Sequence, residues 1–209
     1  MICILGGTFD PVHFGHLRPA LDVQQALDID CVHLLPCRFP PHRELPRLAA
    51  EQRLALLRLA VDGEPGLAID QRELQREGPS YMVDTLGSLR AESGQRPLCL
   101  ALGMDALAGL ESWHRWEEIR GLCHLVVMQR PGNRWPQGGA LGEWLARARI
   151  DDRQELFARP AGCVLGVQVT QLNISATRIR ELLSAGRSAR YLLPEAVLER
   201  ILQENWFAN

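Results

Sequence analysis

The stretch Ile2-Cys3-Ile4-Leu5-Gly6-Gly7-Thr8-Phe9-Asp10-Pro11-Val12-His13-Phe14-Gly15-His16 decides the fold, because it combines a strand, a glycine turn, a loop and the start of a helix. Its first apolar run does not alternate with polar residues, which is typical of a strand covered on both faces. The two glycines after that run permit a tight turn and a close approach of the backbone to a ligand. Helical spacing of apolar residues follows, and the helix is predicted to begin near Gly15 or His16.

A phosphate site is predicted at this turn between strand and helix. The first N–H groups of a helix have no partner within the helix, so they suit an anion. His13 and His16 lie beside these groups, where an imidazole can donate a hydrogen bond or carry positive charge. The same spacing also suits a metal ion, but no cysteine or acidic cluster is nearby to complete the ligand shell. The plainer alternative is that His13 caps a turn and His16 packs in the first helical turn.

Composition and charge limit the classes of function. The chain has 209 residues, of which 46% are hydrophobic and 23% charged, as is typical of a globular domain with a sizeable core. The formal net charge of −2 predicts no general attraction to nucleic acid or to an anionic membrane. All 23 basic residues are arginines, which excludes Schiff-base lysine chemistry and a Walker-A lysine. A cationic clamp on a phosphate must therefore use arginine or protonated histidine.

The six cysteines favour a reducing environment. They form no CxxC pair and most fall in apolar strand-like runs, so buried free thiols are expected rather than disulfides or a zinc site. No apolar run approaches the roughly 18 residues of a membrane span, and no signal-peptide pattern is seen. We therefore expect a cytoplasmic protein without membrane association, whose oligomeric state the sequence does not predict.

Strand-like and helix-like segments alternate along the chain, which predicts an α/β fold with a Rossmann-like, doubly wound parallel sheet. The whole of 1–209 is predicted to be one domain, with a small C-terminal helical part from about 174 to 209. Asp105 is expected to cap a short helix, and the charged segment 72–77 is expected to be exposed. The order of the segment 132–142, which contains several glycines, is left open. Strands are predicted at 2–5, 31–35, 67–70, 98–102, 124–128 and 164–169, and helices at 49–61, 80–89, 113–119, 174–183 and 194–203.

The second informative stretch is Ile174-Ser175-Ala176-Thr177-Arg178-Ile179-Arg180, at the start of a predicted helix. Taken alone, it is an ordinary helix cap followed by a solvated arginine. Together with the first stretch, it resembles the HxGH and ISxTxxR signatures of the nucleotidyltransferase α/β-phosphodiesterase superfamily. The resemblance implies that this stretch holds the β- and γ-phosphates of a nucleotide from the side opposite the histidines. The fuller family form has a second serine where this chain has Ala176, so one hydroxyl contact is absent.

The segments between these two signatures narrow the resemblance to bacterial nicotinate-nucleotide adenylyltransferases, and the similarity covers essentially the whole chain. The segments that fall in the family's order are 39–43, 79–86, 103–105, 113, 126–132 and 191–194. The resemblance implies that the substrates are ATP and nicotinate mononucleotide. The products would be deamido-NAD and pyrophosphate, which places the reaction in NAD biosynthesis. It also implies Mg²⁺ bound mainly through the substrate phosphates, without a named protein ligand.

The resemblance also implies a role for residues at the matching positions. Three of them, His13, His16 and Arg180, would be catalytic because they neutralise charge on the leaving pyrophosphate. The implied ATP-binding residues are Gly6, Gly7, Thr8, Phe9, His13, His16, Arg43, Gly103, Asp105, Ser175, Thr177 and Arg180. Nicotinate mononucleotide would be bound by Thr85, Trp113 and Arg43.

Physical chemistry supports the nicotinate pocket, although plainer readings exist. An indole such as that of Trp113 stacks on a pyridinium by cation–π and dispersion forces, and a hydroxyl or amide donates to the nicotinate carboxylate. Alternatively, Trp113 anchors its helix to the core, and Trp116 competes with it as the stacking partner. The family often has tyrosine where this chain has His114, and no role is assigned to His114. His33 and His124 are interpreted as structural.

The predicted mechanism is direct in-line transfer, in which a phosphate oxygen of the mononucleotide attacks the α-phosphorus of ATP. A phosphate monoester is already anionic near neutral pH, so positioning and charge stabilisation replace a general base. Three alternatives remain open at this point: a pantetheine-phosphate adenylyltransferase, an enzyme that uses nicotinamide mononucleotide equally well, and a nucleotide sensor without turnover.

Overall fold

The computed structural model describes residues 1–40, 45–129, 132 and 134–208, and its centre is a seven-stranded sheet. The strand order is β3-β2-β1-β4-β5-β7-β6, and every neighbouring pair is parallel. The predicted doubly wound parallel sheet is therefore confirmed. The strands are β1 (Ile2–Gly7), β2 (Val32–Pro36), β3 (Leu67–Ile69), β4 (Leu98–Gly103), β5 (His124–Gln129), β6 (Arg149–Ile150) and β7 (Val164–Gln168).

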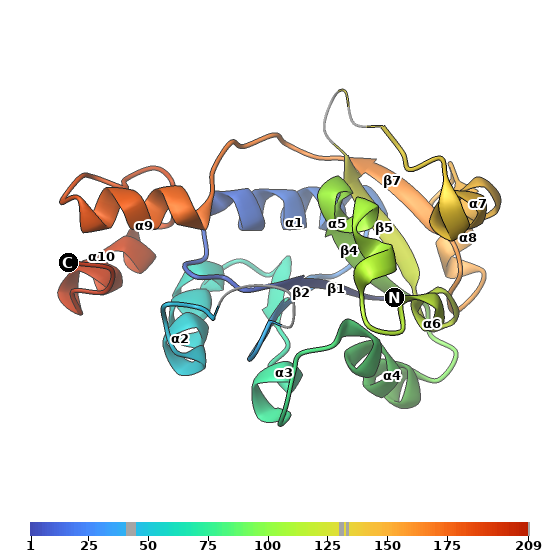
Figure 1. The fold of residues 1–209 in the computed structure, drawn as a ribbon, viewed down its shortest axis with the longest axis horizontal. Coiled ribbons are helices and arrows are strands. Elements are labelled where there is room, and N and C mark those ends of the chain that lie inside the picture. Colours follow the sequence, from blue (N-terminus) through green and yellow to red (C-terminus); the bar gives the residue numbers. More distant parts are fainter. Residues whose placement is uncertain (41–44, 130–131, 133, 209) are drawn as a thin grey trace.

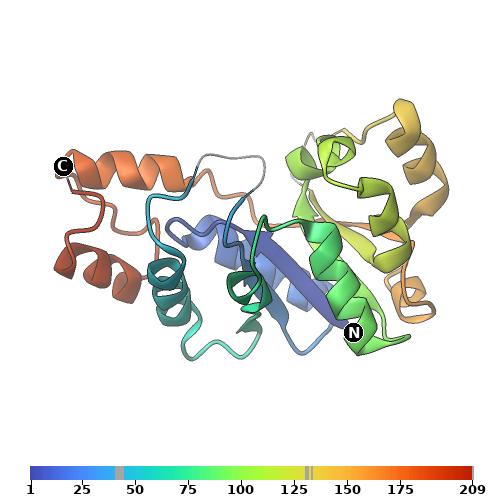
Figure 2. The same cartoon turned by 60° about the horizontal axis from the view of Figure 1, so that its bottom comes forward.

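Helices connect these strands and cover both faces of the sheet, as Figure 1 shows for α1 and α4 on opposite sides of the central strands. The two C-terminal helices lie at one end of the molecule, and α7 and α8 lie at the other (Figures 1 and 2). The prediction of a single domain over 1–209 stays a prediction. The helices are α1 (Phe14–Leu27), α2 (Ala50–Val61), α3 (Arg72–Gln75), α4 (Met82–Ser93), α5 (Met104–Ala108), the 3₁₀ turn η1 (Leu110–Ser112), α6 (Trp116–Leu122), α7 (Gly139–Ala148), α8 (Gln154–Phe157), α9 (Ala176–Ser184) and α10 (Glu195–Gln203).

Two hydrophobic cores lie on the two faces of the sheet, because successive side chains of a strand point to opposite faces. Cys3 and Leu5 of β1 pack in one core, together with buried residues of α1, α2, α9 and α10. Ile4 packs in the other core, with buried residues of α4, α5, α6 and α7. The uninterrupted apolar run of β1 is thus explained by burial on both sides.

The sheet changes direction between β1 and β4, and this point organises the candidate site. From β1 the chain runs outward through β2 and β3, then returns to β4 on the other side of β1. Ligands of such sheets bind beyond the carboxyl ends of the strands at this switch point. The loops that follow β1, β2, β4 and β7 all leave from this edge, and they contain the segments singled out in the sequence.

Several local predictions were wrong in ways that have physical reasons. The helix expected at 113–119 begins instead at Trp116, after Arg115 adopts a left-handed φ of 51°. The N-cap of α5 is Gly103, so Asp105 lies in the first turn and does not cap the helix through its side chain. Glu73 was expected to be exposed but is 2% exposed, and its carboxylate accepts a hydrogen bond from the buried Thr85 hydroxyl, which lowers the cost of this burial. Of the segment 132–142, whose order was left open, residues 139–142 form the start of α7 and Gly138 is its N-cap.

Two other observations bear on the environment of the protein. All six cysteines are free thiols, as predicted, and four of them are buried. Within the described part of the chain, no helix combines the length and the apolar character needed to cross a membrane.

The contacts of His124 support its interpretation as a structural residue. Nε2 of its ring lies 2.9 Å from the Arg159 carbonyl oxygen, and Nδ1 accepts a hydrogen bond from the Cys163 amide at 3.0 Å.

Candidate functional site

Two stacked imidazoles mark the junction between β1 and α1. His13 is the N-cap of α1 and is 4% exposed, and its ring centroid lies 3.7 Å from that of His16. The His13 amide donates to Nδ1 of His16 at 3.3 Å. The edge of the Phe9 ring contacts His16 with centroids 5.0 Å apart. The His16 ring is therefore held by the His13 amide, by stacking on the His13 ring and by contact with the Phe9 ring.

Burial decides the charge of His13. Removal of the ring from water lowers the pKa of His13 to about 4, because desolvation disfavours the protonated form. Nδ1 of His13 is buried and has no hydrogen-bond partner among the described residues. His13 is thus a neutral imidazole near pH 7, and it can donate one hydrogen bond to a phosphate oxygen but contributes no positive charge.

The two sequence signatures meet at Asp10, although they lie at opposite ends of the chain. Nη1 of Arg180 donates to the Asp10 carbonyl oxygen at 2.6 Å, and it lies 3.8 Å from Oδ2 of the Asp10 carboxylate. Nη2 of Arg180 also donates to the Thr177 hydroxyl at 3.2 Å. The Asp10 carboxylate accepts the amides of Arg47 and Leu48 at 2.8 and 3.1 Å. Asp10 therefore joins α9, the first loop and the segment before α2.

A close backbone approach supports the same convergence. A Cβ atom placed on Gly15 would lie 3.1 Å from the Ile174 carbonyl oxygen and 2.9 Å from the His13 ring. The Phe14 amide donates to the Leu192 carbonyl oxygen at 3.1 Å. The start of α1 thus touches both the second signature and the loop before α10, so the two histidines and the start of α9 lie in one region.

The remaining predicted nucleotide residues border this region from neighbouring loops. Gly6 and Gly7 end β1, and a Cβ on Gly6 would lie 2.9 Å from Cε of Met82 at the start of α4. Gly103 ends β4 with open space where a side chain would be, and Asp105 is exposed next to it. Because β1 and β4 are adjacent, these loops share one edge of the sheet.

The hydroxyls at the start of α9 are already used locally. Ser175 is the N-cap, and its Oγ accepts the Arg178 amide at 3.2 Å, as an ordinary cap would. Each hydroxyl keeps its own proton for donation, because Ser175 and Thr177 act only as acceptors in these contacts. Arg43, predicted to contact both substrates, lies outside the described residues.

Trp113, predicted to bind the nicotinate ring, lies in the loop between η1 and α6. It is half-buried against the core of α4 to α7, between η1 and α6. Its neighbour His114 packs on the Tyr81 ring with centroids 4.3 Å apart, and Arg115 forms an ion pair with Asp84 at 3.5 Å. The Trp113 loop is therefore attached to the first turn of α4, the turn that leads to Thr85.

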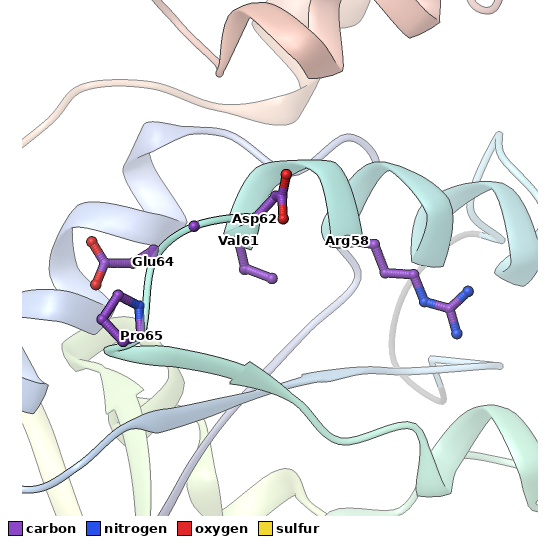
Figure 3. Close-up of a pocket in the computed structure, with 6 residues that line it drawn as sticks. Arg58, Val61, Asp62, Glu64 and Pro65 are labelled. Atoms are coloured by element: carbon purple, nitrogen blue, oxygen red, sulfur yellow. The ribbon is translucent and has the colours of Figure 1, made fainter.

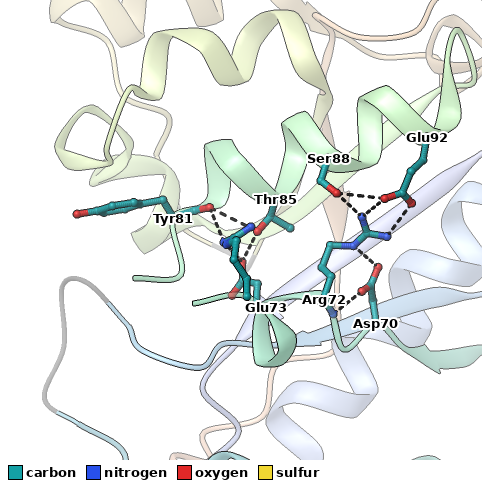
Figure 4. Close-up of polar contacts among 8 residues, drawn as sticks. Asp70, Arg72, Glu73, Tyr81, Thr85, Ser88 and Glu92 are labelled. Atoms are coloured by element: carbon teal, nitrogen blue, oxygen red, sulfur yellow. Dashed lines mark hydrogen bonds and ion pairs between the residues drawn. The ribbon is translucent and has the colours of Figure 1, made fainter. Parts of the chain in front are cut away.

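Thr85 is buried, and its hydroxyl has a partner that the sequence did not predict (Figure 4). Oγ1 of Thr85 donates to Oε1 of Glu73 at 2.6 Å. Burial raises the pKa of Glu73 above its usual range, while the Thr85 hydroxyl and the Arg76 guanidinium oppose the shift. A hydroxyl has one proton, so in this arrangement Thr85 cannot also donate to a nicotinate carboxylate.

We expect Thr85→Val to lower the free energy of unfolding by about 1–3 kcal/mol, because it removes the Thr85 hydroxyl from the buried Glu73 carboxylate and leaves Ser80 as its remaining hydroxyl partner. Urea unfolding at pH 8 measures the change. Thr85→Ser is the control, since it keeps the hydroxyl. In a Glu73→Leu background the loss should shrink by about 1 kcal/mol or more, and an unchanged loss would contradict the coupling of the two groups.

Sequence reasoning missed three supporting residues: Asp10 as a junction, Glu73 and Arg53. Arg53 is 1% exposed and donates to three backbone carbonyl oxygens. No local pattern distinguishes it from the other arginines of an amphipathic helix. Its position three residues after the start of α2, on the face that also carries buried leucines, was the only available signal.

A shallow depression elsewhere on the surface does not coincide with this region. It lies at the turn between α2 and β3, with Asp62, Glu64 and Pro65 on its rim (Figure 3). That turn leads into the amino end of β3, the edge of the sheet opposite to the candidate site. It contains none of the predicted site residues.

Comparisons with known proteins agree with both signatures. The cytidylyltransferase-like family model matches residues 4–182. The chain is 50% identical over 206 residues to a "Probable nicotinate-nucleotide adenylyltransferase" of Halorhodospira halophila, covering 99% of this chain and 94% of that protein. It is 48% identical over 210 residues to the protein of the same name from Methylococcus capsulatus, covering 100% of both.

Solved structures share the fold at lower sequence identity. The Plasmodium falciparum nicotinic acid mononucleotide adenylyltransferase complexed with NaAD has a TM-score of 0.73 at 16% identity, covering 99% of this chain and 96% of that one. A putative nicotinate-nucleotide adenylyltransferase from Vibrio parahaemolyticus has a TM-score of 0.64 at 16% identity, with coverage of 99% and 94%. At such identity these structures support the architecture alone.

Proposed function

This chain belongs to the cytidylyltransferase-like family, and within it to the nicotinate-nucleotide adenylyltransferases, and from that premise we propose how its residues perform the reaction. The reaction joins nicotinate mononucleotide to the adenylyl group of ATP and belongs to NAD biosynthesis. The observation that carries this conclusion is near-50% identity over the full chain to relatives of that name. The relatives favour nicotinate mononucleotide over phosphopantetheine as the acceptor.

Adenylyl transfer proceeds in line. A phosphate oxygen of nicotinate mononucleotide attacks the α-phosphorus of ATP, the new oxygen–phosphorus bond forms, and the bond to the bridging oxygen breaks. Pyrophosphate leaves with the electron pair of that bond. The attacking group is an anionic phosphate, so no protein base has to remove a proton. The barrier falls through alignment of the reactants and stabilisation of charge on the leaving group.

The β- and γ-phosphates lie between the start of α1 and the start of α9. His13 donates from a neutral ring, which burial supports, and His16 contacts the phosphates beside it. Arg180 supplies positive charge from α9, and its contact with Asp10 supports this placement. The hydroxyls of Ser175 and Thr177 donate from the same side. Backbone groups of the loop from 6 to 9 approach the nucleotide, as the two glycines allow.

The nucleoside and nicotinate parts bind along the edge between β1 and β4. Gly103 leaves room for the nucleotide, and the exposed carboxylate of Asp105 faces a ribose hydroxyl. The Trp113 indole stacks on the pyridine ring. The buried Thr85 lies beneath the nicotinate ring and contacts it without donating to it. Amides of the first turn of α4 donate to the nicotinate carboxylate. Arg43 would add charge on the phosphates from outside the described residues.

Mg²⁺ is the proposed cofactor, and it would be held together with the substrate phosphates. Phosphate oxygens and water would hold most of its coordination positions, since Mg²⁺ prefers oxygen ligands and keeps several waters. Among the described residues, no group of three or more histidine, cysteine or acidic side chains suited to a metal ion is found. When bound, Mg²⁺ neutralises phosphate charge. The cytoplasm is the proposed location, and the six free thiols support it.

Release of pyrophosphate from ATP tests the function. We expect release with nicotinate mononucleotide and Mg²⁺, little release with nicotinamide mononucleotide, and none with phosphopantetheine. The amide lacks the carboxylate charge that the donors of the α4 turn would meet. Equal kcat/KM for acid and amide would remove the proposed selectivity. ATP binding without release for any acceptor would favour a nucleotide sensor instead.

A further inference from the structure

Arg53 is a buried cation whose hydrogen bonds all reach backbone oxygens. Its guanidinium donates to the carbonyl oxygens of Thr8, Leu48 and Arg38, at 2.7, 3.2 and 3.4 Å. None of the ion pairs formed by the described residues includes Arg53. Burial of a cation costs free energy unless its donors are satisfied, so these carbonyls must stay oriented toward Arg53.

The three carbonyls belong to two loops beside the candidate site, the β1–α1 loop and the two ends of the β2–α2 loop. Thr8 lies in the loop between β1 and α1, Arg38 follows β2, and Leu48 precedes α2. Leu48 is also held from the other side, because its amide donates to the Asp10 carboxylate that lies beside Arg180. One side chain of α2 thus fixes the relative positions of segments that surround the proposed phosphate site.

The contact with Thr8 has a direct consequence for His16. A peptide group is planar, so the N–H of Phe9 points to the side opposite the Thr8 carbonyl that Arg53 holds. Phe9 has a left-handed φ of 50°, and its ring contacts His16 edge-on. If the Thr8 carbonyl turned away from Arg53, the Phe9 backbone and ring would move with it. Arg53 therefore acts on His16 through Thr8 and Phe9.

A role in stability alone is the competing explanation, and Arg90 provides the comparison. Arg90 also donates to backbone carbonyl oxygens, those of Leu122, Pro160, Gly94 and Arg96, at 2.7–3.0 Å. These carbonyls precede β4, β5 and β7, at the amino ends of the strands. The two arginines thus make the same kind of contact, Arg53 near the carboxyl ends of the strands and Arg90 near their amino ends.

We propose that Arg53 is a positioning residue for adenylyl transfer, which keeps the loop before α1 and the segments on either side of 41–44 in the geometry that His16 needs. The prediction for kcat rests on the proposed function, whereas the prediction that Arg53 holds the loop before α1 in place does not depend on it. Lysine cannot replace Arg53, because one ammonium on a flexible stem cannot reach three separate carbonyls as the planar guanidinium does.

The test compares Arg53→Lys with Arg90→Lys, at a temperature where circular dichroism shows both variants folded. We expect Arg53→Lys to lower kcat about tenfold or more, with KM values for both substrates changed less than about threefold. Arg90→Lys should keep kcat within about twofold, even where its Tm falls by a similar amount. Arg53→Ala should regain part of its kcat with millimolar guanidinium, and Arg90→Ala should not respond.

Hydrogen exchange gives a readout that does not depend on turnover. Arg53→Lys should speed amide exchange in 6–13, and Arg90→Lys should leave that segment unchanged. A normal kcat and normal exchange in folded Arg53→Lys would overturn the proposal, and so would a failure of both Arg53 variants to fold, which would assign a stability role. Absent turnover by the wild-type protein would instead count against the proposed function, while the exchange result would still decide the role of Arg53.

Discussion

His16→Ala is expected to lower kcat about 10²–10³-fold, the usual cost of removing one preorganised donor that stabilises charge in a transition state. The charge here develops on the pyrophosphate that leaves ATP. The side chain of His16 is half-buried, and its Nδ1 accepts the His13 amide at the start of α1, so the variant also loses this one helix-capping contact. Pyrophosphate release under saturating substrates measures kcat, and circular dichroism checks the fold.

His33→Ala is the matched control for this variant. His33 is also a half-buried histidine, but it lies near the amino end of β2, where its ring contacts Cys31. Its replacement should leave kcat within about twofold. If His16→Ala turned over ATP at a near-normal rate, His16 would lose its proposed role, and the transfer would depend on Arg180 and the backbone donors.

Gly15→Ala is expected to lower kcat/KM about 100-fold, because the added methyl group has no space between the two signatures. Its position lies 2.9 Å from the His13 ring and 3.1 Å from the Ile174 carbonyl oxygen. The ring of His13 is buried against His16, so neither neighbour can withdraw without moving the site. A displacement of reacting groups by about 1 Å costs a factor of this size.

Gly87→Ala in α4 separates this effect from the general effect of a glycine-to-alanine change. A Cβ at Gly87 meets open space, so alanine should stabilise the helix by about 0.5–1 kcal/mol and leave kcat/KM unchanged. Steady-state kinetics with both substrates varied gives the comparison. A Gly15→Ala enzyme with wild-type kcat/KM would mean that the close approach of α1 to Ile174 has no part in catalysis.

The sequence predicted the chain path around the site well, because its signals are local. The apolar run of β1, the glycines after it and the helical spacing after His16 each report on a few neighbouring residues. The same holds for the cap at Ser175, which the structure confirms. The boundary at Trp116 was missed because a single left-handed residue, Arg115, delays the helix, and arginine carries no signal for that conformation.

Pairings between distant residues were not predictable in the same way. Arg180 meets Asp10 across 170 positions of sequence, and Arg53 meets Thr8 across 45. Thr85 was expected to donate to a substrate, but burial next to Glu73 gives its proton another acceptor. A pattern of residue types does not state which buried donor finds which acceptor.

The sequence by itself determined six of the seven described strands, the two signatures, the absence of lysine and the family, whereas β6, α7 and α8 were not predicted. Tertiary structure alone decided that Arg180 meets Asp10 where the two signatures converge, that burial keeps His13 neutral, and that the buried Arg53 donates to carbonyl oxygens of two loops. The physical reason is that periodicity and turn residues act through neighbours along the chain. Desolvation and hydrogen bonding between remote segments exist only once the sheet has brought those segments together.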